Sequence, residues 1–291
     1  MATEYYYFVT GLPALHLEDT KLLMTPLMFL QSAEEHLNKD DYDLLKLLVF
    51  PNDLINLVNI LLKEEDWIDE NTISREEWII LIDNIKELKE QSNLRKKHID
   101  DHVLPLVIDY LMHYFKENEV KTKQELLTDL FSIFYNWVEH HENKFVREWF
   151  TFDAAMRNII TALNCRKHNL DVNAKLIGNN ELTEKLKTSK VADFGLNSEF
   201  PWFDTLTRLT ELTDIVEKEK GYDALRWQWL DDRTFFEYFT IPRIMAYYIK
   251  LEIIYRWIHL SQSVGEKKFN QIINDLEASF SFPEEFAINK R

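Results

Sequence analysis

The sequence predicts an all-α protein with one short strand-like piece near its N-terminus. Apolar residues recur at helical spacing along most of the chain. Prolines stand in the first turn of several of these segments, where a helix loses no hydrogen bond to them. Two capping boxes, Ser74-x-x-Glu77 and Thr122-x-x-Glu125, place a hydroxyl and a carboxylate where they satisfy free backbone N–H groups at a helix start.

The N-terminal third is expected to hold the strand-like piece and four helices. Residues Tyr5–Thr10 are aromatic and β-branched and end at a Gly-Leu-Pro turn, which is typical of a short extended segment. Thr25 caps a helix that begins with Pro26. Pro51 is expected to break the following apolar stretch in two. The predicted helices are therefore 26–37, 42–50, 53–63 and 75–93.

The remaining helices are predicted from the same signals. Asp100 and Asp101 precede a helix with Pro105 in its first turn. Gly221 is expected to stop one helix, and Gly265 is expected to separate the last two. The predicted helices are 105–115, 123–149, 152–167, 203–220, 223–239, 240–260 and 266–279.

Composition narrows the classes of partner. Asp and Glu outnumber Lys and Arg by 50 to 34, and the formal net charge of −16 repels nucleic acid and anionic lipid. A basic protein surface would be attracted instead, although charge of this kind also serves solubility alone. The five glycines are far apart, so no glycine-rich phosphate-binding loop can form from contiguous sequence. Nucleic acid and nucleotide cofactors are therefore not expected.

Cysteine usage and hydropathy favour a cytoplasmic protein. Cys165 is the only cysteine, which excludes an internal disulfide, and we expect it to be a small buried apolar residue. The N-terminus lacks the basic and apolar regions of a signal peptide. No uncharged apolar run reaches the roughly 18 residues of a membrane helix. The closest candidate, 244–260, contains three charges, so any membrane association is expected to depend on partners.

One enzymatic alternative comes from acidic residues. Asp231, Asp232 and Glu237 resemble the magnesium-diphosphate motif of class I terpene synthases, whose carboxylates supply the oxygen ligands that Mg²⁺ prefers. The second metal motif of that family fails, since Ala278 and Phe282 stand where ligands belong. The alternative to a site is a solvated acidic helix.

Two adjacent histidines form a weaker candidate. His140 and His141 stand between Glu139 and Glu142, but neighbouring residues on a helix point about 100° apart and do not easily share one ion. Zinc-protease and di-iron spacings are both missing. We therefore interpret these histidines as surface residues.

Charged pairs within apolar helices carry more weight. Asp153 and Arg157, like Glu252 and Arg256, are four residues apart and can meet on one helix face. The apolar residues around Glu252 favour partial burial of its pair, whereas an exposed pair would contribute little. Segments beginning at Asp53, Asp153 and Glu252 also recur at intervals of about a hundred residues. Either chance or an internal repeat of three helical units accounts for this pattern.

Several motifs resemble one family. Residues Pro242, Ala246-Tyr247-Tyr248, Lys250, Glu252 and Arg256 resemble the C-terminal signature of the V-type and archaeal-type ATPase central-stalk subunit, called C in prokaryotes and d in eukaryotes. Asp153, Asn158 and Arg166 are similar to an earlier repeat of that family. The N-terminal Tyr5-Tyr-Tyr-Phe-Val with Gly11-Leu-Pro13 resembles a divergent bacterial branch encoded beside V-type ATPase genes. The chain departs from the pattern in its first repeat, which has Asn56 and Asn59 but no arginine.

The resemblance implies three related helical domains, 1–97, 98–196 and 197–291, in a funnel around a pseudo-threefold axis. It implies a non-catalytic rotor subunit without a cofactor, peripheral on the cytoplasmic face of the membrane. Its partners would be the ring of proton- or sodium-carrying membrane subunits and the subunits of the central shaft. The transported ion and the direction of ATP synthesis or hydrolysis stay open, and a generic cytosolic helical adaptor is a further alternative.

The candidate structural or partner-interface residues all carry a charged, amide or phenolic side chain. They are Asp153, Arg157, Asn158, Arg166, Tyr247, Tyr248, Lys250, Glu252 and Arg256. We expect Glu252 and Arg256 to pair within the helical hub and to hold its geometry.

Overall fold

The computed structural model describes residues 4–90, 105–117, 120–173 and 175–279, and for residues 88–90 and 262–279 it describes the backbone alone. This part of the chain is all-α, as predicted, and contains no strand. Its helices are α1 (Tyr6–Gly11), α2 (Pro26–His36), α3 (Lys39–Leu62), α4 (Arg75–Glu90), α5 (Pro105–Glu117), α6 (Lys123–Val138), α7 (Lys144–His168), α8 (Glu181–Thr188), α9 (Phe203–Glu211), α10 (Ile215–Arg233) and α11 (Ile241–Ser279).

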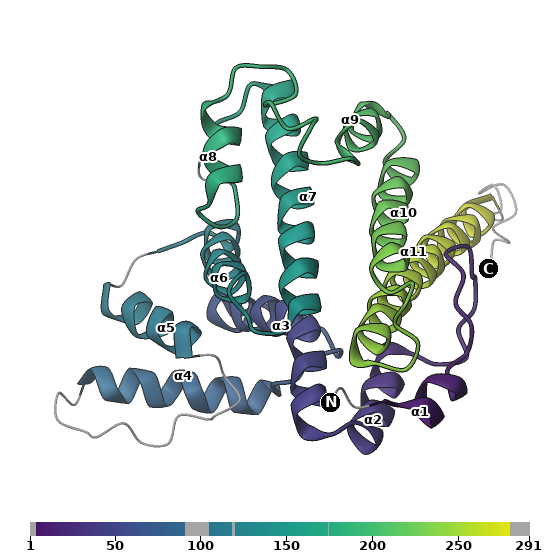
Figure 1. Ribbon diagram of the computed structural model, residues 1–291, viewed down its shortest axis with the longest axis horizontal. Helices are drawn as coiled ribbons and strands as arrows, with labels where there is room; N and C mark the ends of the chain where they lie inside the picture. The colour runs from purple at the N-terminus through teal and green to yellow at the C-terminus, as the bar shows by residue number, and fades with distance from the viewer. Residues whose placement is uncertain (1–3, 91–104, 118–119, 174, 280–291) are drawn as a thin grey trace, which may run out of the picture.

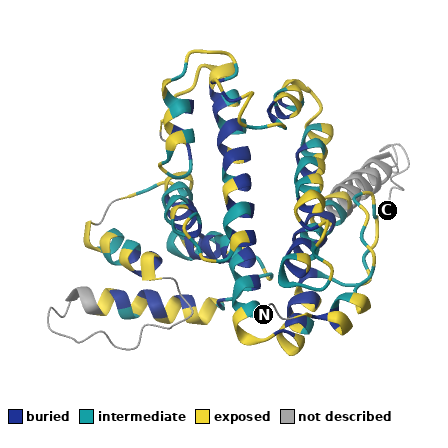
Figure 2. Cartoon of the chain, in the orientation of Figure 1, coloured by how far each residue is buried: buried dark blue, intermediate teal, exposed yellow. Residues whose placement is uncertain are grey.

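The helices surround one connected hydrophobic core. Helix α3 lies near the centre of the view and packs against α6, α4 and α11, and α7 stands above it (Figure 1). Buried residues follow one side of most helices, as Figure 2 shows. The core cluster contains residues of α1 through α11. The division at 97/98 lies outside the described residues, and the three-domain arrangement stays a prediction.

Helix starts agree best with the sequence. Thr25 accepts a hydrogen bond from the Met28 N–H, with Pro26 as the first residue of α2. The capping box of α6 is complete, and the box that opens α4 has both of its hydrogen bonds. Pro242 lies in the first turn of α11, and the hydroxyl of Thr240, the residue before this helix, donates to Glu237. Asp100 and Asp101 lie outside the described residues.

The predicted N-terminal strand is wrong. Residues Tyr6–Gly11 form α1, in which Phe8 is buried against Phe29 of α2 at 5.7 Å between ring centroids. The N–H of Tyr5 donates to the carbonyl of Phe239, far along the chain. Packing against α2 and against the α10–α11 connection therefore overrides the local β propensity of this segment.

Proline and glycine were wrongly expected to end two helices. Helix α3 continues through Pro51, which costs a backbone hydrogen bond within the helix. The flanking residues Val49, Phe50 and Leu54 are buried, and Phe50 packs on Phe134 of α6, so packing offsets the loss. Helix α11 similarly continues through Gly265, where glycine costs only about 1 kcal/mol relative to alanine.

Helix α3 is also long and apolar enough to cross a membrane, alone among the helices of the described residues. Its most apolar window is 56% buried in the structure. Residues Leu45, Leu54 and Leu57 of this helix are fully buried. This burial is typical of the core helix of a folded domain.

Other boundaries differ from the prediction. The segment 123–149 contains two helices, because Asn143 caps α7 by accepting from the Val146 N–H. Asp214 caps α10, so this helix begins before Gly221. It ends at Arg233 rather than at residue 239. Helix α8, which opens with an Asn180–Thr183 capping box, was not predicted.

Gly221 lies inside α10, where α10 packs on α9. A Cβ atom at this position would lie 2.2 Å from Cδ2 of Leu209. Gly221→Ala is therefore expected to lower the free energy of unfolding by about 1 kcal/mol, although alanine ordinarily stabilises a helix. In a Leu209→Ala background the same change should stabilise the protein. Urea unfolding of the wild type, the two single variants and the double variant measures this reversal. If Gly221→Ala raised the free energy of unfolding equally in both backgrounds, the result would contradict this expectation.

Candidate functional site

Asp153 of α7 lies at the centre of a buried cluster of charges. It is only 5% exposed, and its Oδ2 accepts hydrogen bonds from Arg157 Nε at 2.7 Å and from the hydroxyl of Tyr135 on α6. Its Oδ1 lies 3.4 Å from Nε of Arg226 on α10. Burial alone would raise the pKa of Asp153, but the two arginines and the Tyr135 hydroxyl lower it to about 2. The predicted Asp153–Arg157 pair is therefore confirmed.

A second buried carboxylate extends the cluster to α11. Asp223 on α10 is 1% exposed, and its Oδ1 accepts from Arg226 Nη1 at 3.2 Å. Its Oδ2 accepts from Arg256 and from the indole N–H of Trp257 at 2.7 Å. Arg226 thus bridges the two carboxylates, and each carboxylate has several donors.

These seven residues form what we call the charge network, which joins four helices. It consists of Tyr135, Asp153, Arg157, Asp223, Arg226, Arg256 and Trp257. Buried ion pairs contribute little net stability, but removal of one partner is costly, so such a network fixes how the helices meet. Next to it, Phe152 of α7 stacks on Trp229 of α10 with 5.0 Å between ring centroids. The α7–α10 contact is therefore both polar and aromatic.

Asn158 and Arg166 hold the segments around α8. The side chain of Asn158 is 1% exposed and makes two 2.8 Å hydrogen bonds, one with the carbonyl and one with the N–H of Ile177. Arg166 donates to the carbonyls of Ser189, Val191 and Ala192. Both candidate residues thus form hydrogen bonds with backbone groups of their own chain.

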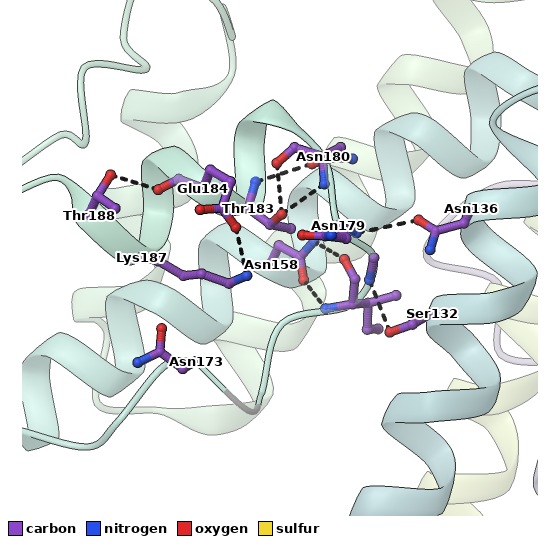
Figure 3. A network of polar contacts seen from close by, with 12 residues as sticks. Ser132, Asn136, Asn158, Asn173, Asn179, Asn180, Thr183, Glu184, Lys187 and Thr188 are labelled. Atoms are coloured by element: carbon purple, nitrogen blue, oxygen red, sulfur yellow. Dashed lines mark hydrogen bonds and ion pairs between the residues drawn. The ribbon is translucent and has the colours of Figure 1, made fainter.

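Figure 3 shows the polar surroundings of Asn158. Ser132 and Asn136 of α6 accept from the N–H groups of Gly178 and Asn179, which follow Ile177. Asn180 then caps α8. These side chains fix the chain between α7 and α8 against α6.

An asparagine in α3 makes the same contact as Asn158. Asn56 is fully buried and bonds the carbonyl and N–H of Ile68 at 2.9 and 2.8 Å. Asp53, in contrast, accepts from Thr72 and Ile73 in the segment just before α4, whereas Asp153 binds side chains of other helices and of its own. The shared contacts therefore match Asn56 with Asn158, whereas the proposed repeat matched the two aspartates.

The predicted pair of Glu252 with Arg256 is wrong. Glu252 accepts from the hydroxyl of Tyr248 at 2.8 Å, and Arg256 reaches across to Asp223. No ion pair joins Glu252 to Arg256 among the described residues. The i,i+4 rule fails here because the buried carboxylate on α10 offers Arg256 a stronger partner than its own helix does.

Glu252 has a strongly shifted pKa. Burial is the main cause, and together with the charge of the nearby Glu70 it raises the pKa to about 7, against the opposing effects of the Tyr248 hydrogen bond and the Arg256 charge. Burial also raises the pKa of Asp53 to about 6. Tyr248 is fully buried, and burial followed by the Glu252 charge raises its pKa well above the usual value.

The shifted pKa of Glu252 predicts a pH-dependent stability. A folded-state pKa above the unfolded value means that stability is complete below about pH 4.5 and declines as pH rises through about 7. Glu252→Gln keeps an acceptor for Tyr248 and removes the charge. It should raise the free energy of unfolding at pH 8 by about 1–2 kcal/mol and have a smaller effect at pH 5.

Urea unfolding at both pH values measures this effect, with the exposed Glu87→Gln as control. A gain from Glu252→Gln that is the same at both pH values would contradict the pKa argument.

Lys250 and Tyr247 also lie on α11 but do not belong to the charge network. Lys250 donates to Asp231 Oδ1 at 2.5 Å and lies over Trp227, so it joins α11 to α10. Burial lowers its pKa, and Asp231 opposes this shift. Tyr247 stacks on Phe29 at 5.4 Å, and its hydroxyl is buried without a hydrogen-bond partner among the described residues.

The acidic residues of the enzymatic alternative do not converge. Helix α10 ends at Arg233, so Asp232 and Glu237 do not share a helix. Asp231 binds Lys250, and Glu237 accepts from Thr240. In the part of the chain that the structure describes, no group of three His, Cys, Asp or Glu side chains is placed to hold a metal ion.

The histidines and the cysteine have ordinary surroundings. His140 is exposed, and half-buried His141 accepts from the N–H of Asn143 in the α6–α7 turn, so the surface interpretation holds in full only for His140. Cys165 is buried, as predicted. Its Sγ lies 3.8 Å from the carbonyl of Asp171.

A pocket of about 410 Å³ opens beside the α7–α10 contact. Its lining mixes aromatic rings with charges of both signs, and it includes Phe152, Trp202, Trp229, Glu148, Glu199 and Arg233. Arg233 lies 5.5 Å from the Trp229 ring centroid and 3.9 Å from Glu148. The guanidinium group of Arg233 therefore already covers the aromatic and acidic part of this lining.

Four residues of the charge network were missed in the sequence. Asp223 and Arg226 are three residues apart on one helix, a spacing that signals a pair. The roles of Tyr135 and Trp257 depend on contacts between helices that are distant in sequence, for which the sequence carries no signal.

The comparisons with known proteins identify one family. A family model matches residues 1–280, and its description is "Protein of unknown function (DUF2764)". Neither a curated protein nor a solved structure matches the chain.

Proposed function

The chain belongs to the DUF2764 family, and we propose that it is a non-catalytic central-stalk subunit of a V-type or archaeal-type ATPase. In this role it couples the rotating shaft to the membrane ring of proton- or sodium-carrying subunits. It acts on the cytoplasmic face of the membrane, as a peripheral part of the complex.

The observation that carries the proposal is the charge network. Asp153 and Arg256, which stand in two of the motifs that resemble the stalk subunit, both belong to it. A coupling part must transmit torque without changing its shape, and a buried network that penalises any relative movement of α6, α7, α10 and α11 suits that requirement. The donors of Asp153 and Asp223 come from the chain itself, which favours a structural role over a catalytic one.

Reconstitution tests the proposal. The purified protein is mixed at low salt with shaft subunits and with the membrane ring in nanodiscs, and association is followed by size-exclusion chromatography. We expect a complex that contains all three components. We also expect that omission of the protein uncouples ATP hydrolysis from ion pumping in proteoliposomes.

Two results would contradict the proposal. One is failure of the protein to associate with either the ring or the shaft when both are supplied. The other is magnesium-dependent turnover of an isoprenoid diphosphate that Asp232→Ala abolishes.

A further inference from the structure

Exposed aromatic side chains gather where the start of the chain meets the α10–α11 connection. The N–H of Tyr5 donates to the carbonyl of Phe239 at 2.7 Å, and the rings of Tyr6 and Phe239 lie 4.3 Å apart. These contacts hold α1 beside the α10–α11 connection, at the lower right of Figure 1. The exposed rings of these two contacting segments, which we call the aromatic tip, are Tyr6, Tyr7, Phe235, Phe236 and Tyr238. Phe235 and Phe236 pack on each other with 4.9 Å between ring centroids.

The exposure of these rings is large. Tyr7 is 95% exposed and Phe236 is 80% exposed. Single exposed apolar residues are ordinary, but a group of neighbouring large rings is typical of an interaction surface. Aromatic residues are also enriched among those that dominate binding energy.

The connection that carries three of these rings is an ordered turn. Thr234 is buried, and its hydroxyl donates to the carbonyl of Leu230. The N–H of Glu237 donates to the carbonyl of Thr234, and Thr240 donates to Glu237. The backbone that carries the rings is therefore fixed before a partner arrives, which lowers the entropic cost of binding.

Charge narrows the choice of partner. Three acidic residues, Glu4, Asp232 and Glu237, are close to the rings in sequence. Of the two nearby arginines, Arg243 and Arg233, the second already lies 3.9 Å from Glu148. The whole chain carries −16, which disfavours both an anionic lipid surface and a second copy of the chain. An apolar protein surface with a basic rim would be complementary to the aromatic tip and its acidic surroundings. Cytoplasmic loops of membrane proteins carry an excess of Lys and Arg, and so they fit this description.

We propose that the aromatic tip is the surface by which this protein docks on the cytoplasmic loops of the membrane-ring subunits. This inference rests on the proposed stalk function and assigns one face of the molecule to one of its two partners. The shaft then binds elsewhere on the molecule.

Binding to the ring in zwitterionic nanodiscs tests the proposal. The triple variant Tyr7→Ser, Phe235→Ser, Phe236→Ser should raise the Kd for the ring about thirtyfold or more, because it removes exposed rings that act as binding anchors. Binding to the shaft subunits should stay unchanged. The control variant Ile80→Ser, Leu170→Ser, Val191→Ser removes the same number of exposed apolar side chains elsewhere and should bind the ring as the wild type does. Asp232→Lys should weaken ring binding and reduce its salt dependence.

Other outcomes separate this inference from the proposed function. Unchanged ring binding by the triple variant would overturn the inference and leave the stalk function intact, as would loss of shaft binding alone. Equal affinity of the wild type for empty nanodiscs would show that lipid is the partner. A wild-type dimer that the triple variant abolishes would show that the tip binds a second copy. A large fall in Tm of the triple variant would show that the rings pack within the chain.

Discussion

Asp153→Ala is expected to lower the free energy of unfolding by about 3 kcal/mol. The change leaves the Tyr135 hydroxyl buried without its acceptor and takes one carboxylate from Arg226. The loss stays near the lower end of the range for a broken buried ion pair, since Arg226 keeps Asp223 and the Arg157 side chain, which is 43% exposed, can turn to water. Urea unfolding at pH 7 measures the effect.

Two further measurements distinguish the network from simple loss of packing. Arg157→Gln changes the exposed partner of Asp153 and should cost about 1 kcal/mol or less. The wild type should lose stability as pH falls from about 4 to about 2, because a folded-state pKa near 2 means that Asp153 stabilises the fold only while it is ionised. Asp153→Ala should lack that part of the acid dependence. An equal acid dependence in both proteins would contradict the electrostatic argument.

Capping motifs in the sequence predicted three helix starts well, whereas proline and glycine predicted helix ends poorly. The caps at Thr25, Ser74 and Thr122 involve hydrogen bonds within one turn, and the structure has all three. Pro51 and Gly221 were expected to end helices but lie inside them, because contacts with α6 and α9 decide the outcome there. Such contacts join residues distant in sequence, and local propensity does not report them.

The same distinction applies to the candidate site. The Asp153–Arg157 pair lies within one helix and was predicted correctly. The Glu252–Arg256 pair has the same spacing, but Arg256 binds Asp223 of another helix. Spacing identifies which side chains share a face, and the neighbouring helix decides which partner each of them takes.

Asn158→Ala is expected to lower the free energy of unfolding by about 2–3 kcal/mol. The change removes two hydrogen bonds and leaves the N–H and the carbonyl of Ile177 without the partners that Asn158 supplies. Because Ile177 is only partly buried, water can replace some of that loss. Urea unfolding measures the effect, and Asn173→Ala, which removes an exposed asparagine, is the matched control with an expected change below about 0.5 kcal/mol.

Amide hydrogen exchange shows whether Asn158 acts as a local clamp. If it holds the chain between α7 and α8 on α6, the N–H groups of Ile177 and Gly178 should lose protection in Asn158→Ala far more than those of α10. Asn56→Ala should expose Ile68 in the same way, since its contacts are the same. A uniform loss of protection across all helices would contradict a local role. A local loss of protection in both variants would show that an asparagine holds a loop against its helix in the same way in two separate parts of the chain.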